Sequence, residues 1–434
     1  MSSVSHGQSW PVQLRQNSLA LFDQVLVSSA SFLTTLIVGR FGSDHELGLL
    51  GLGTAVALTV ASVLESVVCF PYIFRASRRE PGTLADYTGS ALLHTVLLSA
   101  VTTLALVGAI LGGGDLMPSG LPSVLWVICF TIFFFLVRIF IRRHYLLQMD
   151  LRGLIAYDAI AFVVQAGVLA AAIGRGRVTG IAGQWSIGLS CAVVSIYWLW
   201  KERKTFSLTR HWQSHFSENW DFGKLVLAAQ AFYALHNQIL VWILAALHGT
   251  NLAGQFVASF SVVMLNNPFV LGLMNIVAPR VSHAFSEGGA PRVRQVVWEN
   301  LKFMMAGVTA ILILLVLLGA PILQFLFGQQ YGGQQLTISL LAIAVFAEAN
   351  CKTVEHGLLA LDKPQFVAWV NVVRFVLTAV IALVLIPRYK VVGASAALAI
   401  ADVAASGMMF VYFLRETSVP SVKSTASPTS QHHA

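Results

Sequence analysis

Long apolar stretches follow one another along almost the whole chain, separated by short polar or Gly/Pro-rich segments. A helix that crosses the hydrocarbon core of a membrane needs about 20 mostly apolar residues. Such a helix also satisfies its own backbone hydrogen bonds, as lipid requires. The pattern therefore predicts an all-α polytopic membrane protein with about twelve transmembrane helices. The predicted spans are residues 18–40, 47–72, 86–112, 120–141, 153–174, 179–200, 223–247, 252–278, 298–320, 336–360, 365–387 and 391–414.

The composition agrees with this membrane class. Of the 434 residues, 56% are hydrophobic and only 11% are charged, whereas soluble proteins carry roughly 25% charged residues. A soluble fold of this composition would expose large apolar areas and aggregate. The polar N-terminal residues lack a signal-peptide pattern, and we interpret them as a cytoplasmic tail. The cysteines lie in or beside apolar spans and are expected to be small core residues without disulfides: Cys69, Cys129, Cys191 and Cys351.

The distribution of Lys and Arg predicts the orientation of the helices. Cytoplasmic loops of membrane proteins carry an excess of these residues, and most of the 27 lie in the two tails and the even-numbered loops. Both termini and the even-numbered loops are therefore predicted to be cytoplasmic. The net charge of +8 then reflects topology, and no nucleic-acid partner is expected. The odd-numbered loops hold only Arg40, Arg175, Arg177, Arg388 and Lys390.

The second half of the sequence repeats features of the first half in the same order. Residues 143–150 (RHYLLQMD) resemble residues 355–362 (EHGLLALD). We infer a duplication into two six-helix bundles, related by a pseudo-two-fold axis along the membrane normal because six is an even number. The predicted divisions are a first bundle at 1–200, a basic cytoplasmic linker at 201–222, a second bundle at 223–416 and a disordered cytoplasmic tail at 417–434.

The chain lacks several short motifs that mark known chemistries. It has no G-x-x-x-x-G-K-[ST] phosphate-binding loop, no H-E-x-x-H and no G-x-S-x-G. No loop is long enough for a soluble catalytic domain. We therefore expect no enzymatic activity, no cofactor and no metal centre. Any work must draw on an ion gradient, the membrane potential or a substrate gradient.

Four segments resemble the polysaccharide-flippase branch of the multidrug/oligosaccharidyl-lipid/polysaccharide exporter superfamily. They are residues 39–48 (GRFGSDHELG), 278–282 (APRVS), 326–331 (LFGQQY), and 385–389 (LIPRY) with 393–397 (GASAA). The resemblance extends over roughly residues 15–415 and is looser in the first half. The first segment departs from the family in having His45-Glu46-Leu47 where an aromatic residue often precedes the glycine.

The resemblance implies an alternating-access transporter that flips a lipid-linked oligosaccharide, carried on polyprenyl pyrophosphate, from the inner to the outer leaflet of a bacterial inner membrane for surface polysaccharide biosynthesis. The expected partners are this lipid-linked glycan, membrane lipid, a polysaccharide polymerase and glycosyltransferases. The coupling ion would be H+ or Na+, and the chain is expected to be a monomer. An anionic head and a long apolar tail require a cationic cavity that opens laterally to lipid.

Three arginines are candidates for binding the pyrophosphate in the cavity. Ionisable residues inside membranes are costly and therefore mark functional sites, and a guanidinium can bind a phosphate in a bidentate manner. Arg374 has an ion pair with Glu348 as its structural alternative. Arg138 can instead snorkel to the cytoplasmic interface, and Arg40 can anchor the outer interface.

Polar and acidic residues within the spans complete the candidate site. Gln230, Tyr233 and Asn237 share one helical face and are predicted to line a wet cavity or to hydrogen-bond between helices. Pro268 interrupts a span and is predicted to be a hinge or a simple kink. The lone His236 is interpreted as structural. The candidates for binding the coupling ion, or for balancing the buried arginines, are Glu65, Asp158, Glu348 and Asp402.

Two rival functions stay open. An ion-coupled multidrug or small-molecule antiporter of the same superfamily would have the same fold and topology. A membrane glycosyltransferase or polymerase is favoured by Asp44, His45 and Glu46 in the first outer loop, although such enzymes usually have long outer loops and these are short. A channel is disfavoured because no filter motif is present.

Overall fold

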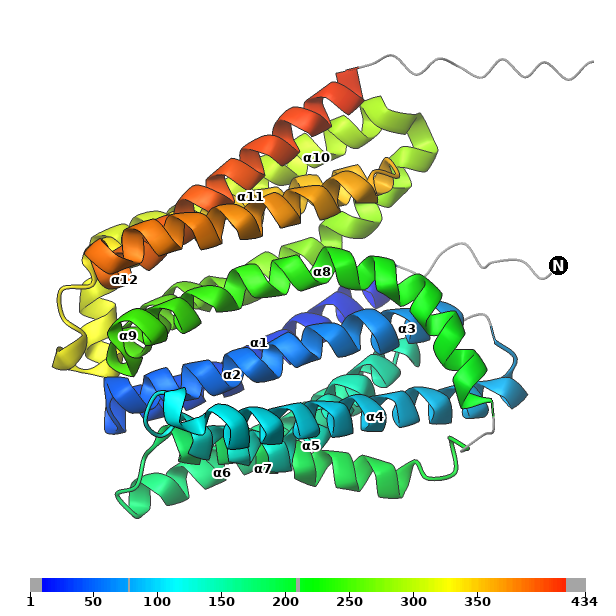
Figure 1. Cartoon of the computed structure of the whole chain (residues 1–434). Helices are drawn as coiled ribbons and strands as arrows, with labels where there is room; N and C mark the ends of the chain where they lie inside the picture. Colours follow the sequence, from blue (N-terminus) through cyan, green and yellow to red (C-terminus); the bar gives the residue numbers. More distant parts are fainter. Residues whose placement is uncertain (1–9, 77–78, 208–210, 419–434) are drawn as a thin grey trace, which may run out of the picture.

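The computed structural model describes residues 10–76, 79–207 and 211–418 (Figure 1). The predicted C-terminal tail lies outside these residues except for Thr417 and Ser418, whereas α1 begins at Trp10, within the predicted N-terminal tail. The helices are α1 (Trp10–Phe41), α2 (Asp44–Leu64), a π-helical turn η1 (Glu65–Cys69), α3 (Phe70–Ala76), α4 (Pro81–Gly113), η2 (Gly114–Leu116), α5 (Leu121–Leu147), α6 (Leu151–Gly174), α7 (Gly180–Lys201), α8 (Trp212–His248), α9 (Thr250–Val263), η3 (Met264–Asn266), α10 (Asn267–Phe327), η4 (Gln329–Tyr331), α11 (Gln335–Ala360) and α12 (Pro364–Ser418).

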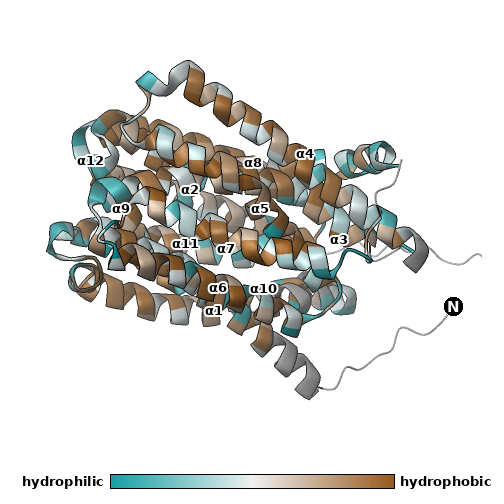
Figure 2. Cartoon of the chain, turned by 90° about the horizontal axis from the view of Figure 1, so that it is seen from below, coloured by the Kyte–Doolittle hydropathy of each residue, from teal (hydrophilic) through white to brown (hydrophobic). Residues whose placement is uncertain are grey.

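Eleven helical stretches in this described part are long and apolar enough to cross a membrane. The last stretch, Pro364–Ser418, contains two of the predicted spans. The backbone breaks between these two spans at Lys390, with φ 51° and ψ −125°. Hydrophobic residues cover most of the helix lengths, and hydrophilic residues gather mainly at their ends (Figure 2). The predicted all-helical, multi-pass membrane fold is therefore confirmed.

Local sequence signals explain where several helices begin and bend. The Ser43 hydroxyl accepts a hydrogen bond from the backbone N–H of Glu46 and caps α2, as serine commonly does at helix starts. The Asp150 carboxylate caps α6 in the same way. Within α10, the chain turns at Gly288 and at Gly289, whose φ of 61° and ψ of −152° are favourable only for glycine.

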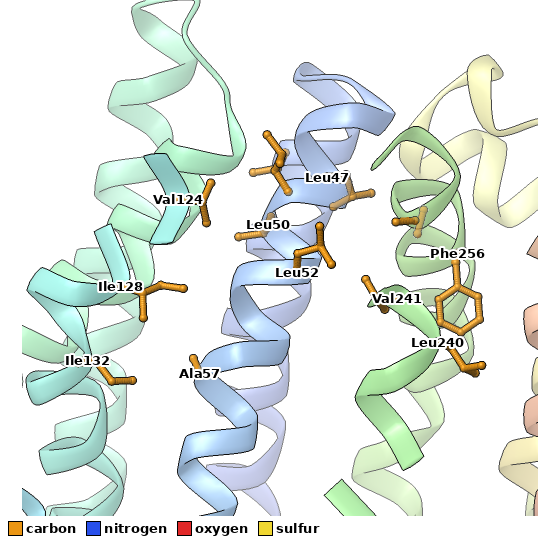
Figure 3. Packing of buried hydrophobic residues seen from close by; sticks show 14 of the residues in the cluster. Leu47, Leu50, Leu52, Ala57, Val124, Ile128, Ile132, Leu240, Val241 and Phe256 are labelled. Atoms are coloured by element: carbon orange, nitrogen blue, oxygen red, sulfur yellow. The ribbon is translucent and has the colours of Figure 1, made fainter. Parts of the chain in front are cut away.

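The helices pack as two groups. The first helix group (α1–α7) and the second helix group (α8–α12) meet where α2 lies against α8 and α9, and where α1 lies against α10 (Figure 1). The apolar contact across α2 is continuous from one group to the other. Figure 3 shows Leu47, Leu50 and Leu52 of α2 between Val124, Ile128 and Ile132 of α5 and Leu240, Val241 and Phe256 of α8 and α9.

The predicted domain boundaries and the internal duplication stay predictions. The first helix group ends with Lys201, close to the predicted boundary at 200. The predicted linker, however, is only partly a connecting segment, because α8 already begins at Trp212. Its first two turns pack beside α3 and α4 through ion pairs of Glu218 with Arg75 and Arg79, at 3.0 and 2.8 Å.

Candidate functional site

A buried charged cluster lies in the second helix group and includes the predicted residue Arg374. Its Nε atom lies 3.6 Å from Asp402 Oδ1, and its Nη2 atom lies 3.0 Å from Cys351 Sγ. His236 Nε2 approaches the same Asp402 oxygen at 3.2 Å. Arg374 and Asp402 are each 1% exposed, and His236 is fully buried. The partner of Arg374 is thus Asp402, and the predicted ion pair with Glu348 is not formed.

Glu348 is instead held by α8. Its carboxylate accepts a hydrogen bond from the Tyr233 hydroxyl. Lys352, one turn further along α11, lies 4.2 Å above the Tyr233 ring and forms a 3.0 Å ion pair with Glu355. Tyr233 therefore contacts a carboxylate and a cation of α11 at the same time.

A second charged cluster ties three helices of the first helix group. Asp158 of α6 pairs with Arg138 at 2.8 Å and also with Arg142, and Arg142 reaches Asp23 of α1 at 2.8 Å. The Asp158 side chain is completely buried. Arg138 is therefore held against α6 by an ion pair. Its predicted role in the cavity stays a prediction.

Glu65, unlike the other predicted acidic residues, lies outside both of these charged clusters. It forms a bidentate ion pair with Arg143, with contacts of 2.9 and 3.0 Å. Both side chains are partly exposed, at 23% and 35%. Glu65 also begins the π-helical turn η1, a feature that often occurs at functional sites. The pair lies at the predicted cytoplasmic end of α5.

Arg40 lies at the opposite end, where the two helix groups close on one another. Its Nη1 atom donates to the backbone carbonyl of Phe325 at 3.0 Å. Gly48 of α2 and Gly254 of α9 meet so closely that backbone faces backbone. Asp44 completes the contact by accepting a 3.1 Å hydrogen bond from the Asn251 amide. We call the contact of residues 40–48 with 250–255 and 325 the outer seam.

The residues that favoured a polymerase belong to this outer seam. The Asp44 carboxylate faces α9, His45 contacts the Thr250 hydroxyl, and the Glu46 carboxylate accepts a 2.7 Å hydrogen bond from the backbone N–H of Gly180. Their side chains thus hold helices together. No group of three or more His, Cys, Asp or Glu suited to a metal ion occurs among the described residues.

The remaining predicted residues lie on α8 and at the start of α10. Asn237 donates to the backbone carbonyl of Tyr233 at 2.9 Å, and Gln230 is half-buried on the same helix. The predicted interruption at Pro268 is present, since the 3-10 turn Met264–Asn266 separates α9 from α10. Asn266 is 3% exposed, and its Oδ1 atom has no hydrogen-bond partner among the described residues. The hinge role of Pro268 stays a prediction.

The sequence interpretation missed His236, Lys352 and Asp23 as members of the clusters. A signal for one of the ion pairs, that of Arg138 with Asp158, was present. In an antiparallel helix hairpin, residues equally far from the turn lie at the same depth. Arg138 and Asp158 are so placed around the turn at Gln148, which caps the C-terminal end of α5.

A groove of about 390 Å³ lies on the second helix group, between α10, α11 and α12. Its wall is mainly apolar, and the Cβ position of Gly407 faces open space. The other residues that line it include Trp298, Leu301, Met305, Phe346, Asn350 and Phe410.

No family model and no curated protein matches the sequence. Solved structures do match. An inward-facing multidrug resistance MATE family transporter of the MOP superfamily superposes with a TM-score of 0.76 at 14% identity, over 90% of this chain and 94% of that chain. An outward-facing MATE transporter gives 0.65 at 13% identity, over 93% and 95%. The lipid II flippase MurJ in an inward closed conformation gives 0.71 at 11% identity, over 93% and 90%. The chain therefore has the helical membrane fold that these MOP-superfamily transporters share.

Proposed function

We propose that the chain is an alternating-access transporter and that its structure is the inward-facing state. The observation that carries the proposal is the outer seam, where backbone meets backbone at Gly48 and Gly254. An alternating-access cycle requires such a contact to close one end of the molecule and to break when that end opens. The TM-score with the inward-facing MATE structure, 0.76, exceeds that with the outward-facing one, 0.65, and supports this assignment.

The opposite end differs in a way that fits an open cytoplasmic side. The helices α10, α11 and α12 diverge there from the first helix group (Figure 1). A cavity of about 820 Å³ lies at the bend of α10, and its lining includes the charged side chains of Arg280, Glu287 and Arg292 and the imidazole of His283. This end also carries most of the basic residues, which predicts that it faces the cytoplasm. We propose that the membrane is a bacterial inner membrane.

The cargo that we propose is a lipid-linked oligosaccharide on polyprenyl pyrophosphate. Three observations support it: the resemblance of four segments to polysaccharide flippases, the shared fold with a lipid II flippase, and the apolar groove beside Gly407. A groove of about 390 Å³ can hold several isoprene units of a carrier tail. The face of α11 that carries Lys352 and Glu348 would then contact the polar part of the cargo.

The similarity to MATE transporters favours a second candidate, an ion-coupled multidrug or small-molecule antiporter. Such a cargo is smaller and needs no lipid groove. The two candidates therefore differ in whether the cargo remains in the bilayer during transport.

The two candidates can be separated by depleting the protein in its host and locating the lipid-linked glycan. Spheroplasts are treated with an impermeant glycan-modifying enzyme. Accumulated glycan that is protected from this enzyme is the expected result, because unflipped carrier stays in the inner leaflet. Accumulated glycan that is accessible would contradict the flippase and favour a polymerase or ligase. Unchanged glycan levels would favour the small-molecule antiporter.

A further inference from the structure

We propose that Arg294 and the apolar groove between α10, α11 and α12 form one binding site for the polyprenyl pyrophosphate carrier, with the diphosphate on Arg294 and the tail in the groove. The identity of this occupant rests on the proposed flippase function. The site itself follows from the shape and depth of the groove and from the position and charge of Arg294. We call residues 290–327, the part of α10 beyond the glycine reversal, its second arm.

Arg294 lies on the face of the second arm that lines the groove. The groove residues Trp298, Leu301 and Met305 follow it at intervals of four, seven and eleven residues, which is the spacing of one helical face. The Arg294 guanidinium also lies 3.4 Å from the Ser418 hydroxyl in the last turn of α12, and α12 forms another wall of the groove. Arg294 therefore lies at one end of the groove.

The groove has about the depth of one leaflet. Met305 lies eleven residues beyond Arg294, or about 16 Å along an α-helix, and the hydrocarbon core of a bilayer is about 30 Å thick. Between them, the Trp298 ring meets Phe410 edge to face at 5.3 Å, and tryptophan is enriched at membrane interfaces. Because the second arm begins at the end of the molecule proposed to be cytoplasmic, the groove extends into the inner leaflet and Arg294 lies at headgroup level.

The half-buried Arg294 forms no ion pair with a carboxylate among the described residues. The carboxylates on nearby turns have other partners, since Glu299 contacts Gln295 at 3.0 Å and Glu416 pairs with Lys363 at 3.0 Å. A guanidinium can donate two parallel hydrogen bonds to a phosphate. A cation at headgroup level beside an apolar groove is therefore complementary to a lipid with a phosphate head.

The shape of the groove favours the carrier over a diacyl phospholipid. One groove of about 390 Å³ accompanies Arg294. A phospholipid would leave its second chain outside, whereas the carrier has one tail for each head. Gly407 presents no side chain to the groove, which leaves room for the methyl branches of an isoprenoid. The diphosphate also carries more negative charge than a phosphodiester, and this charge strengthens its hydrogen bonds to a guanidinium.

The site would hold the carrier beside the cytoplasmic cavity before transport. Val296, Glu299 and Phe303 of the second arm line that cavity, and they lie on the helical face opposite the groove. Arg292, two residues from Arg294, lines the same cavity. A diphosphate that leaves Arg294 therefore has to cross only the start of the second arm to reach the cavity, while the tail stays in the leaflet.

Binding can be measured by native mass spectrometry of the full chain with three probes: a polyprenyl pyrophosphate, the corresponding polyprenol, and phosphatidylglycerol. Arg294→Gln should weaken binding of the pyrophosphate about tenfold, because the bidentate contact is lost, and should leave polyprenol binding unchanged. Arg294→Lys should restore only part of the affinity, since an ammonium group lacks the planar fork. Arg388→Gln is the matched control, at an exposed arginine predicted to lie at the opposite end.

Two results would contradict the proposal. If folded Arg294→Gln binds the pyrophosphate as the parent does, Arg294 does not bind the head. If phosphatidylglycerol binds as tightly as the pyrophosphate and is weakened equally by Arg294→Gln, the site belongs to an anionic phospholipid and not to the carrier.

The position of the tail can be mapped with a polyprenyl pyrophosphate that carries a photoreactive diazirine in its tail. Cross-links are expected within residues 298–305 and 403–410, and cross-links confined to other helices would exclude the groove as the tail site. A fluorescent polyprenyl pyrophosphate in proteoliposomes then separates the site from the proposed function. A probe that cross-links to the groove but is not translocated supports the site and contradicts the flippase. Translocation at the parent rate by Arg294→Gln supports the flippase and contradicts the role of the site in transport.

Discussion

The outer seam yields the sharpest structural prediction, the effect of Gly254→Ala. A Cβ atom at Gly254 would lie 2.7 Å from the carbonyl carbon of Asp44 and 2.9 Å from the backbone nitrogen of Gly48. The Asp44 carbonyl oxygen would lie closer still. Because atoms in contact stay roughly 3.5–4.0 Å apart, α2 and α9 would have to separate by more than about 1 Å. Backbone atoms cannot rotate away as a flexible side chain can. The substitution therefore acts on the distance between the two helix groups.

The expected magnitude follows from the energy of overpacking. Inserting a methyl group into a well-packed contact costs about 1–3 kcal/mol. This cost applies only to the state in which α2 and α9 touch. An energy of that size changes the ratio of two conformations by about 5- to 150-fold. Gly254→Ala should therefore shift the protein toward the outward-facing state, while the buried cores of both helix groups stay intact.

The shift can be measured by double electron–electron resonance in nanodiscs. Spin labels are placed on Arg175→Cys and Gln329→Cys, two exposed positions at the outer ends of the two helix groups. The partly buried Cys129 is replaced by alanine, since the other native cysteines are buried. Gly254→Ala should add a population with a longer label distance. Gly407→Ala is the matched control, because no atom lies within 4 Å of its Cβ position.

A clear result would refute the reasoning. If Gly254→Ala folds normally and keeps the distance distribution of the parent, the contact of α2 with α9 does not determine closure of the outer end. If Gly407→Ala produces the same shift, the effect comes from helix propensity and not from the close backbone approach. Only a shift that occurs in Gly254→Ala and not in Gly407→Ala supports the outer seam as the contact that closes the outer end.

Three further predictions concern the other clusters. Asp158→Ala leaves two buried arginines without their shared carboxylate and should cost about 3–5 kcal/mol of stability, measured as a lower thermal unfolding midpoint in detergent. Burial and the charge of Arg79 lower the pKa of His215 below 6.5. Its 3.2 Å contact with Arg79 therefore holds while His215 is neutral and is lost as the pH falls through the lowered pKa. Limited trypsin cleavage between α7 and α8 should accelerate on acidification, and His215→Gln should abolish this pH dependence. Gly407→Trp should fill the groove and reduce transport of the polyprenyl probe at least tenfold, with Gly108→Trp, on exposed α4, as the control without effect.

The helices were predictable from the sequence because their apolar length is dictated by the membrane and not by tertiary contacts. The interruption before Pro268 was also predictable, since proline cannot continue a hydrogen-bonded helix. The reversal of the chain at Gly288 and Gly289 falls in the connection predicted between the spans 252–278 and 298–320, and the positive φ of Gly289 explains why glycine occupies that position. The helical structure on both sides of this reversal was not predicted.

The partners of the buried charges show where sequence reasoning stops. Glu348 and Asp402 both lie at the depth of Arg374, because each is about as far as Arg374 from the turn of its hairpin. Depth alone therefore did not decide between them. The rotation of α11 decides, since it turns Glu348 toward the Tyr233 hydroxyl and leaves Arg374 with Asp402. That rotation is set by the packing of α11 against α10 and α12, which one sequence does not reveal.

The two buried clusters are built alike but should behave differently. Each lies within an antiparallel hairpin and binds a third helix, α1 in the first helix group and α8 in the second. The first cluster balances two aspartates with two arginines, whose guanidinium groups do not lose protons at physiological pH. The second is held by longer contacts of one carboxylate, Asp402, at 3.2 Å from His236 and 3.6 Å from Arg374. If the two helix groups move against one another, we expect the first cluster to keep its contacts and the second to change them.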